Sequence, residues 1–459
     1  MILDHVRNMY NIPELRRKIF ITLGFLVIYR LGSHIAMPGL DQEAVKEFTK
    51  HIGGAAGGAM VMMAAIGGSA ISQAAIFSLG IMPYISASII FSLLAKVVPA
   101  LEEISKEGAS GQQKINTWTR YATVPLCLIQ ATFIVRYVAN FKGGGIPLVV
   151  DPGFGFMLTG ILALTAGALF LMWIGELITE YGIGNGISLL IMAGIVAQVP
   201  TISEMLLDLG GRGFGRQGST KFIIILMLCG LFVVAVFGVV LMSQAQRRIP
   251  VQAAKHTRGR RVYGGNKSHL PLRLNMAGVM PVIFASSLLM FPVMIGSMFL
   301  RPDNNWLSDV FHPGGFWYTM FYLAMIYFFA YFWTSLMFQP TEMAHNMKEH
   351  GQFVPGIRPG RKTAEFLNFV MVRVTFVGAA FLALVAIFPQ IIVLFLEKVV
   401  LGGEQIKDAE VMAAQFLGGT GILIVVGVVL DLAQKVESHL LMRHYSGFMK
   451  KGRIKGRVD

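Results

Sequence analysis

Residues 155–178 read GFMLTGILALTAGALFLMWIGELI, an apolar run in which Glu176 is the only charged residue. A helix rises about 1.5 Å per residue and the hydrocarbon core of a bilayer is roughly 30 Å thick, so this run is long enough to cross a membrane. Similar runs recur along the whole chain. We therefore predict an all-α, multi-pass membrane protein.

The chain has ten candidate spans of this kind. They lie at residues 19–37, 74–98, 118–138, 155–178, 186–203, 221–242, 275–299, 316–338, 366–388 and 414–433. Residues 391–401 are also apolar, but they follow Pro389 closely, so we expect an external interfacial helix there and not a further span. The first span follows Arg16-Arg17-Lys18 and has no A-x-A cleavage site, so we expect it to be retained.

Composition supports a lipid environment. Of the 459 residues, 54% are hydrophobic and only 14% are charged, whereas soluble domains carry about 25% charged residues. The two cysteines, Cys127 and Cys229, each lie in an apolar run without a CxxC spacing, which favours a structural role.

Basic residues divide the connections into two classes. They gather at residues 7–18, 96–120, 247–273, 348–362 and 435–457, in alternate connections. Because Lys and Arg accumulate on the cytosolic side of membrane proteins, we predict that both termini are cytosolic.

Two basic connections, residues 243–274 and 339–365, are more polar than topology requires. Their candidate contact residues are Arg247, Arg248, Arg260, Arg261, Arg358 and Arg361. Topology determination alone explains such charge, but Pro355 and Pro359 would stiffen a loop that projects Arg358, which favours a docking surface.

A short apolar segment stands between the first two spans. Residues 59–71 are too few to cross the bilayer and are interrupted by Gly67-Gly68. Partial segments at membrane depth occur only inside a protein or along a cavity, so we predict a re-entrant helix. An external amphipathic helix is the alternative.

Motifs for enzymes and coupled carriers are missing. No GxxxxGK[ST], HExxH or GxSxG occurs, so a hydrolase or metalloenzyme is disfavoured and we expect neither a cofactor nor a bound metal. Glu176, Glu365 and Asp431 stand near span ends, and Arg30 and Arg373 have no evident acidic partner within the spans. The lack of central carboxylates disfavours an ion-coupled small-solute transporter, the main alternative function. A membrane scaffold without transport is the other alternative.

Several longer motifs identify a family. Residues 76–88 (IFSLGIMPYISAS), 106–111 (KEGASG), 175–188 (GELITEYGIGNGIS), 259–263 (GRRVY), 269–272 (HLPL), 275–279 (NMAGV), 353–360 (FVPGIRPG) and 418–420 (GGT) occur in this order. Together they resemble the bacterial SecY family of protein-translocation channels. The resemblance covers nearly the whole chain.

The resemblance implies two pseudo-symmetric five-helix halves around a central pore. It places the halves at residues 19–206 and 221–433, after a cytosolic segment at 1–18 and before a basic tail at 434–459. The short apolar segment, about residues 59–73, becomes a plug. The plug residues are Met60, Met62, Met63, Ile66, Gly67 and Gly68.

The resemblance also assigns a pore ring and a lateral gate. The pore ring consists of Ile81, Ile85, Ile187, Ile191, Ile283 and Ile424. The lateral gate, between spans 2 and 3 and spans 7 and 8, consists of Ser86, Ser88, Gln130, Ser286, Ser287 and Phe291. An apolar ring offers ions no hydrogen bonds and blocks conduction when empty. Ordinary helix packing is the alternative role for each of these residues.

Partners follow from the same resemblance. It implies a SecA motor ATPase, the ribosome with its RNA, SecE-like and SecG-like membrane subunits, and secretory and membrane protein substrates. Two positions depart from the family pattern: Gln73 replaces a common arginine, and Ser243-Gln244 replaces an expected acidic residue. We expect plug latching and motor coupling to differ in detail.

Overall fold

The structure is a computed structural model of a mostly helical chain. It describes residues 12–40, 75–140, 149, 153–200, 216–254, 256–258, 261–263, 267–299, 310, 315–395 and 420–451. The predicted plug at 59–73, Gln73 and Arg260 lie outside these residues.

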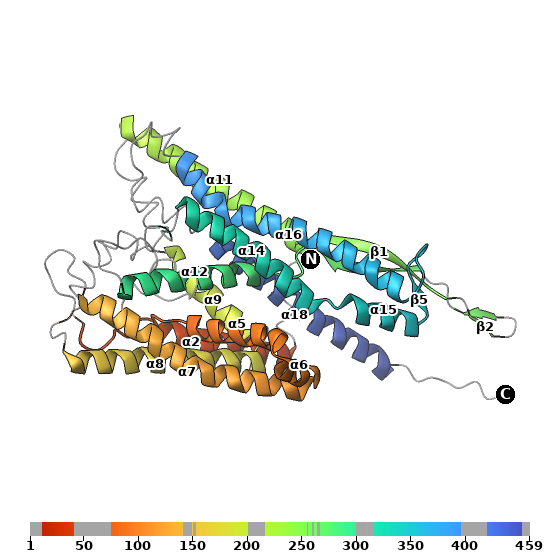
Figure 1. Cartoon of the computed structure of the whole chain (residues 1–459), viewed down its shortest axis with the longest axis horizontal. Helices are drawn as coiled ribbons and strands as arrows, with labels where there is room; N and C mark the ends of the chain where they lie inside the picture. The colour runs from red at the N-terminus through yellow and green to blue at the C-terminus, as the bar shows by residue number, and fades with distance from the viewer. Residues whose placement is uncertain are drawn as a thin grey trace. The chain divides into compact units, whose positions relative to one another are not determined.

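Helices account for most of the described residues (Figure 1). The helices are α2 (Pro13–Gly32), α5 (Met82–Val97), α6 (Pro99–Lys106), α7 (Ala109–Asn140), α8 (Phe154–Tyr181), α9 (Gly186–Val196), α11 (Arg216–Gln244), α12 (Met280–Phe299), α14 (Phe316–Met337), α15 (Pro340–Glu349), α16 (Arg361–Phe395) and α18 (Thr420–Lys451). The strands are β1 (Gln246–Ala253), β2 (His256–Arg258), β3 (Arg261–Tyr263), β4 (Lys267–Arg273) and β5 (Gln352–Phe353).

Each predicted span overlaps one of these helices. Within the part of the chain that the structure describes, four segments are long and apolar enough to cross a membrane: Phe154–Tyr181, Leu226–Gln244, Phe316–Glu349 and Arg361–Ile391. The pair α5 and α6, bent by 99° at Val98, makes a fifth if it is counted as one span. The count of ten spans stays a prediction.

The chain divides into two compact units, each described here by itself. The first comprises Met1–Pro200 with Val428–Asp459, and the second comprises Thr201–Gly427. In the first unit α7 packs against both α5 and α8, and α2 packs against α8 and α9. In the second, α14 packs against both α12 and α16, which also contacts α11 and α15. The predicted limits of the two halves stay a prediction.

Two span boundaries differ from the prediction for the same local reason. The spans predicted from residues 74 and 275 begin as helices only at Met82 and Met280. Gly80 (φ +55°) and Gly278 (φ +61°) hold a left-handed conformation that glycine tolerates without a side-chain clash. Each glycine therefore lies in a turn, and the helix begins only after that turn. A proline, Pro83 or Pro281, then occupies the first turn, where its missing N–H costs no hydrogen bond.

The apolar segment after Pro389 is also placed differently from the prediction. Helix α16 continues through Pro389 as far as Phe395, so residues 391–395 belong to the same helix and do not begin a separate one. Apolar helices of this length lose only one backbone hydrogen bond at a proline, and neighbouring groups compensate for it in membrane proteins.

The chain returns to one place on either side of the predicted plug. Ala36 and Ala75 form an antiparallel bridge, and the N–H of Ile76 donates to the carbonyl of Ile35 at 2.9 Å. The segment that leaves α2 and the segment that arrives at α5 therefore lie side by side.

Candidate functional site

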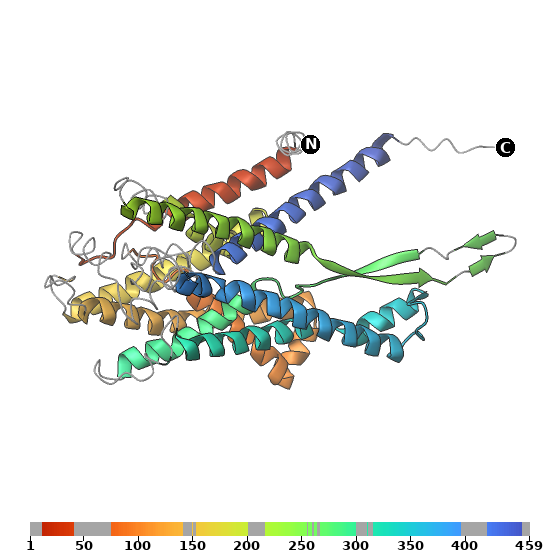
Figure 2. The same ribbon diagram turned by 90° about the horizontal axis from the view of Figure 1, so that it is seen from above.

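The two predicted docking loops are joined in one sheet. Strand β1 pairs antiparallel with β4 along its length, from Gln246 opposite Arg273 to Gln252 opposite Lys267. Its far end also pairs with β5, with Gln252 opposite Phe353, and the N–H of Ala254 donates to the carbonyl of Gly351 at 2.8 Å. The order β4-β1-β5 thus connects the loop after α11 with the loop after α15. Figure 2 shows the hairpin extending from the end of α11.

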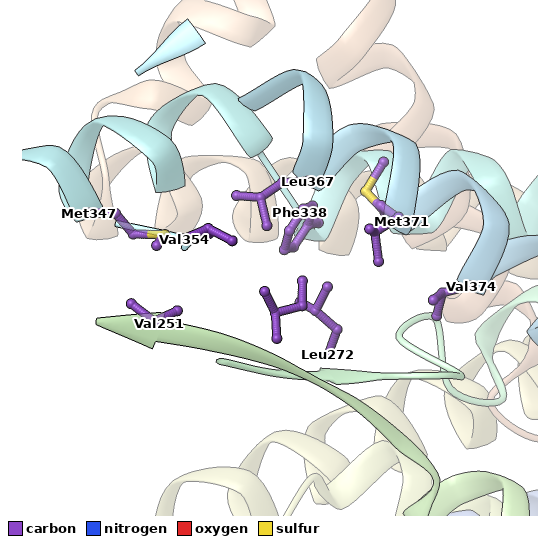
Figure 3. Packing of buried hydrophobic residues seen from close by; sticks show 10 residues of the cluster. Val251, Leu272, Phe338, Met347, Val354, Leu367, Met371 and Val374 are labelled. Atoms are coloured by element: carbon purple, nitrogen blue, oxygen red, sulfur yellow. The ribbon is translucent and has the colours of Figure 1, made fainter. Parts of the chain in front are cut away.

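A hydrophobic cluster lies between this sheet and the helices that flank it (Figure 3). The sheet and its flanking helices contribute Ile249, Val251, Leu272, Phe338, Met347, Val354, Leu367, Val370, Met371 and Val374, none more than 8% exposed. Burying such side chains stabilises a fold by about 1.5–3 kcal/mol each. The docking loops therefore have a shared core that holds them in a defined conformation.

The predicted docking arginines on β1 and in the loop after α15 are exposed. Arg247, Arg248 and Arg358 are exposed, and the side chain of Arg361 is 93% exposed. Arg358 lies in a turn between Gly356 (φ +84°) and Gly360 (φ +101°), and its carbonyl accepts a hydrogen bond from the Thr363 hydroxyl at 3.0 Å. Arg261 begins β3, where its backbone pairs with Arg258.

A local ion-pair group begins α16. The ammonium of Lys362 lies 3.0 Å and the Arg361 Nε 3.3 Å from the Glu365 carboxylate. Arg361 is thus partly neutralised, whereas Arg358 forms no ion pair with any described residue.

Two of the predicted pore residues occupy equivalent places in the local sequence of the two units. Ile85 and Ile283 each stand five residues after the glycine that precedes their helix, within the matching sequences GIMP (80–83) and GVMP (278–281). Sequence reasoning missed this repeat, although both tetrapeptides were visible. The two units therefore present an isoleucine in the first turn of a helix by the same local device.

Burial separates one predicted pore residue from the others. Ile81, Ile85, Ile191, Ile283 and Ile424 are at most 6% exposed. Ile187 is half-buried in the first turn of α9 and lies next to Gly175 of α8. Asn185 caps this helix, because its side-chain oxygen accepts hydrogen bonds from the N–H groups of Ile187 and Ser188.

Most of the predicted gate residues are buried and small. Ser86, Ser286 and Ser287 are at most 4% exposed, while Ser88 and Phe291 are half-buried. The hydroxyl of Ser287 donates to the carbonyl of Ile283 at 2.7 Å, and that of Ser286 donates to Val282 at 2.8 Å. Both bonds lie within α12, so the two hydroxyls need no partner on another helix. The serines therefore act toward neighbouring helices as small side chains.

Gln130 differs from the gate serines. It is 4% exposed on α7, and its side-chain oxygen has no hydrogen-bond partner among the described residues. A buried acceptor without a partner costs about 1–3 kcal/mol, so this position favours an arrangement that would supply a donor.

A polar corner joins α8 and α9, the region of the GELITEYGIGNGIS motif. The Thr179 hydroxyl accepts from the N–H of Gly186 at 2.8 Å, and the Thr22 hydroxyl of α2 accepts from the N–H of Ile183 at 3.1 Å. Leu15, Ile183 and Val436 form a buried cluster at the same corner. The motif therefore fixes the end of α8 and the start of α9 against α2.

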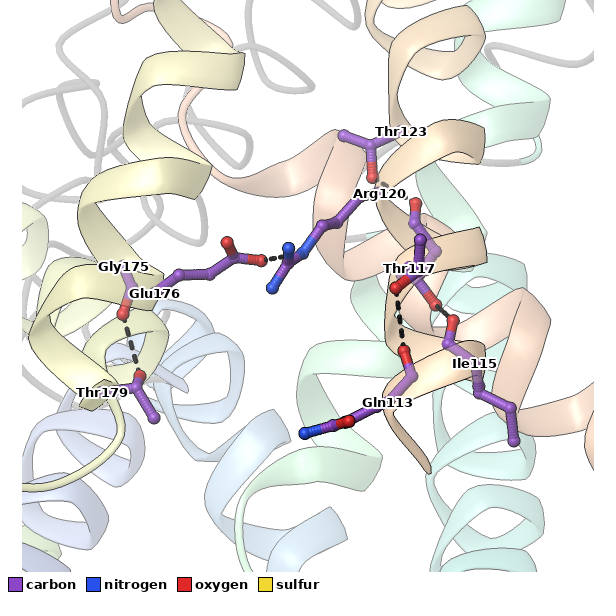
Figure 4. Close-up of polar contacts among 9 residues, drawn as sticks. Gln113, Ile115, Thr117, Arg120, Thr123, Gly175, Glu176 and Thr179 are labelled. Carbon is purple, nitrogen blue, oxygen red and sulfur yellow. Dashed lines mark hydrogen bonds and ion pairs between the residues drawn. The ribbon is translucent and has the colours of Figure 1, made fainter. Parts of the chain in front are cut away.

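An ion pair between α7 and α8 was not predicted from the sequence (Figure 4). The Nε of Arg120 on α7 lies 2.6 Å from the Glu176 carboxylate on α8, with 49% and 25% of the two side chains exposed. The residues are far apart in sequence and follow no helical spacing, so no local pattern indicated the pair. Partly exposed pairs contribute at most about 1 kcal/mol.

The described residues contain no candidate metal site. No group of three or more His, Cys, Asp or Glu residues among them is arranged to hold a metal ion. Of the two cysteines, Cys127 is buried and Cys229 is exposed, and both are free thiols.

Comparison with known proteins gives a single family. The SecY family model matches residues 75–433. The chain is 41% identical to a "Protein translocase subunit SecY" from Escherichia coli strain K12 over 97% of this chain and 96% of that protein. A protein of the same name from Thermotoga maritima is 39% identical over 98% and 99%.

Solved structures share the fold at lower identity. "The structure of a protein conducting channel" matches with a TM-score of 0.59 and 17% identity over 92% of each chain. A SecY structure whose description concerns a plug domain that stabilises the closed state matches with a TM-score of 0.58 and 18% identity, again over 92% of each chain.

Proposed function

Because the chain belongs to the SecY family, we propose that it is the central protein-conducting channel of a protein translocase. Two relatives named as translocase subunits match nearly the whole chain at 41% and 39% identity, and this is the observation that supports the function. A small-solute transporter or a scaffold has no comparable support. We also propose that the chain has no catalytic activity of its own.

We propose an architecture of ten spans in two halves, with a lateral gate for releasing membrane segments sideways. The shared GIMP and GVMP starts of α5 and α12 support pseudo-symmetric halves. The bridge between Ala36 and Ala75 supports a re-entrant plug, because the chain between these residues starts and ends at one place. The domain limits are those predicted from the sequence.

The pore ring is proposed to form from the isoleucines of both halves. Ile81, Ile85, Ile187 and Ile191 would supply one side, and Ile283 and Ile424 the other. A narrow apolar ring excludes water and ions when empty. Its weak, nonspecific contacts would still allow it to deform around an unfolded polypeptide.

The lateral gate is proposed to open along small, weakly polar surfaces. Hydrogen bonds between membrane helices contribute only about 0.6 kcal/mol each on average. The hydroxyls of Ser286 and Ser287 are satisfied within their own helix, so separating α12 from a neighbour would break none of their bonds. The unpartnered oxygen of Gln130 is a candidate acceptor for a polar group of an entering segment.

The sheet β4-β1-β5 with the Arg358 turn is the proposed docking surface for a SecA motor and for the ribosome. Arginine suits both carboxylates and RNA phosphates through its paired donors. A structural neighbour, Sec61 in a canine ribosome-channel complex from the endoplasmic reticulum, matches with 15% identity and a TM-score of 0.58 over 92% of each chain. SecE-like and SecG-like subunits complete the proposed assembly, in a bacterial inner membrane with both termini cytosolic.

Site-specific photocrosslinking tests the channel function. A photoreactive residue at Ile81 or Ile283 should crosslink to a secretory chain arrested during translocation. The same residue at Val233, which is 64% exposed on α11, should crosslink to lipid only. Equal crosslinking from Val233 and Ile283, or none from Ile81 and Ile283, would contradict the proposed pore.

A further inference from the structure

Arg373 stands in an unusual place for a charged residue. It lies within the membrane-crossing segment Arg361–Ile391 and is exposed on the surface of α16. Its neighbours on the same face are apolar and exposed: Phe369, Val372, Phe376 and Val377 are between 43% and 56% exposed. Charged residues in spans usually face the interior of the protein, so an arginine on this face calls for a partner that the described residues do not supply.

The structure gives the direction in which the arginine points. The guanidinium carbon lies 4.1 Å from the ring centroid of Phe369, one helical turn nearer the start of α16. Arg361, Lys362 and Glu365 mark that start as polar. Because a turn spans about 5.4 Å, the guanidinium lies about one turn from Glu365 and about two turns from Arg361 and Lys362, near the depth of phospholipid headgroups.

Nothing described within the chain neutralises Arg373. Among the described residues no carboxylate forms an ion pair with it, whereas Arg361 and Lys362 both share Glu365. The guanidinium therefore keeps its charge and its donors available to a ligand from the membrane.

Tyrosines of α14 border the same spot. The phenol of Tyr331 donates to the carbonyl of Val372 at 3.4 Å, and the ring of Tyr327 lies 5.8 Å from that of Phe376. Tyrosine and arginine side chains with apolar stems and polar ends are typical of the zone where headgroups meet hydrocarbon.

We propose that Arg373, Phe369 and the adjoining tyrosines of α14 bind the phosphodiester of an anionic phospholipid. The lipid would belong to the leaflet around the start of α16, which is the cytosolic leaflet in the proposed topology. Arginine is well suited to phosphate because its planar donors bind two oxygens at once. The acyl chains would lie along the exposed apolar face of α16. This site is separate from the pore and the docking surface.

Lipid retention by the intact membrane complex is the direct test. The complex is reconstituted in nanodiscs with phosphatidylglycerol and phosphatidylcholine, transferred to detergent, and analysed by native mass spectrometry. We expect Arg373→Gln to retain about five-fold less phosphatidylglycerol than the parent, the effect of one basic residue at a membrane surface. Arg373→Lys should keep part of the binding and Phe369→Leu should weaken it.

Arg136→Gln is the matched control. It removes an exposed arginine from α7 in the other unit and should leave phosphatidylglycerol retention unchanged. Circular dichroism of each variant checks that the fold is intact. Since the measurement does not use translocation, its outcome is independent of the channel function.

Three results would overturn the proposal. The first is equal phosphatidylglycerol retention by Arg373→Gln and the parent. The second is loss of a membrane subunit from Arg373→Gln with lipid retention unchanged, which would assign the arginine to a carboxylate of a partner helix. The third is full displacement of the retained phosphatidylglycerol by inorganic phosphate, which would indicate a free-anion site.

Discussion

Gly80 and Gly278 determine where two isoleucines stand in the first turns of α5 and α12. Each glycine takes a positive φ that other residues adopt only with strain, and the helix begins two residues later. Ile85 and Ile283 then follow at the same distance. At this scale the pore hypothesis depends on side chains that carry no polar atoms.

Ile283→Asp should make the closed channel conduct ions. A carboxylate in an apolar neck attracts water, and a hydrated neck no longer excludes ions. Conductance of purified channels in planar bilayers measures the effect. Ile283→Val, which keeps the position apolar, is the control. Channels with aspartate that stay as ion-tight as the parent would remove Ile283 from the ring.

Arg358→Glu should weaken motor docking and secretion without unfolding the protein. The side chain is exposed, and the turn is held by a hydrogen bond from the Thr363 hydroxyl to the Arg358 carbonyl, so the change reverses a charge and leaves the fold intact. We expect roughly tenfold weaker association, measured as binding and translocation with purified motor. Arg358→Lys keeps the charge and should retain most of the activity. Normal translocation by the glutamate variant argues against this contact.

Elements separated by about a hundred residues meet in the sheet β4-β1-β5, and a common cluster covers one face of it. Leu272 is 2% exposed within this cluster. The sheet, the Arg358 turn and the start of α16 thus form one cooperative element, not two independent loops.

Leu272→Ala should loosen both docking loops together. Removing a buried leucine side chain costs about 2–5 kcal/mol where the cavity does not collapse. Hydrogen exchange should rise in residues 246–254 and in residues 351–354 alike. Val233→Ala, an equally apolar change on an exposed helix face, should alter neither. Faster exchange in the first segment alone means that the loops are not coupled.

Sequence patterns identified the helical class and the family, but they did not predict some helix ends or the contacts between distant elements. Hydropathy locates runs such as α8 and α14, because burial in lipid requires continuous apolar sequence. It does not locate the start of α5, where Gly80 and Pro83 override an apolar run, or the end of α16, where Pro389 is tolerated. The β1–β5 pairing and the Arg120–Glu176 ion pair join distant residues and leave no local signal.

The chain divides into two units with separate helix packing, and the proposed pore would need residues from both of them. Each unit carries part of the predicted ring, so the pore cannot be a property of either unit alone. A test of this idea must therefore crosslink a residue of one unit to a residue of the other.

Cysteines at positions 85 and 283 should be joined by a short thiol crosslinker in the closed channel. The pair is made in a chain whose Cys127 and Cys229 are replaced by alanine, because both are free thiols. Cysteines at 85 and 233 are the control and should not react together. Mass spectrometry of the linked peptide gives the answer, and equal yields from both pairs are inconsistent with a ring shared by the units.

The pairing of β1 with β5 also bears on how the docking surface can be exchanged between relatives. Gln252 and Ala253 pair through the backbone with Phe353 and Gln352. A chimaera that takes only one of the two loops from a homologue would contain β1 or β5 without the strand that it pairs with. Successful chimaeras should therefore carry residues 246–273 and 351–360 as a set.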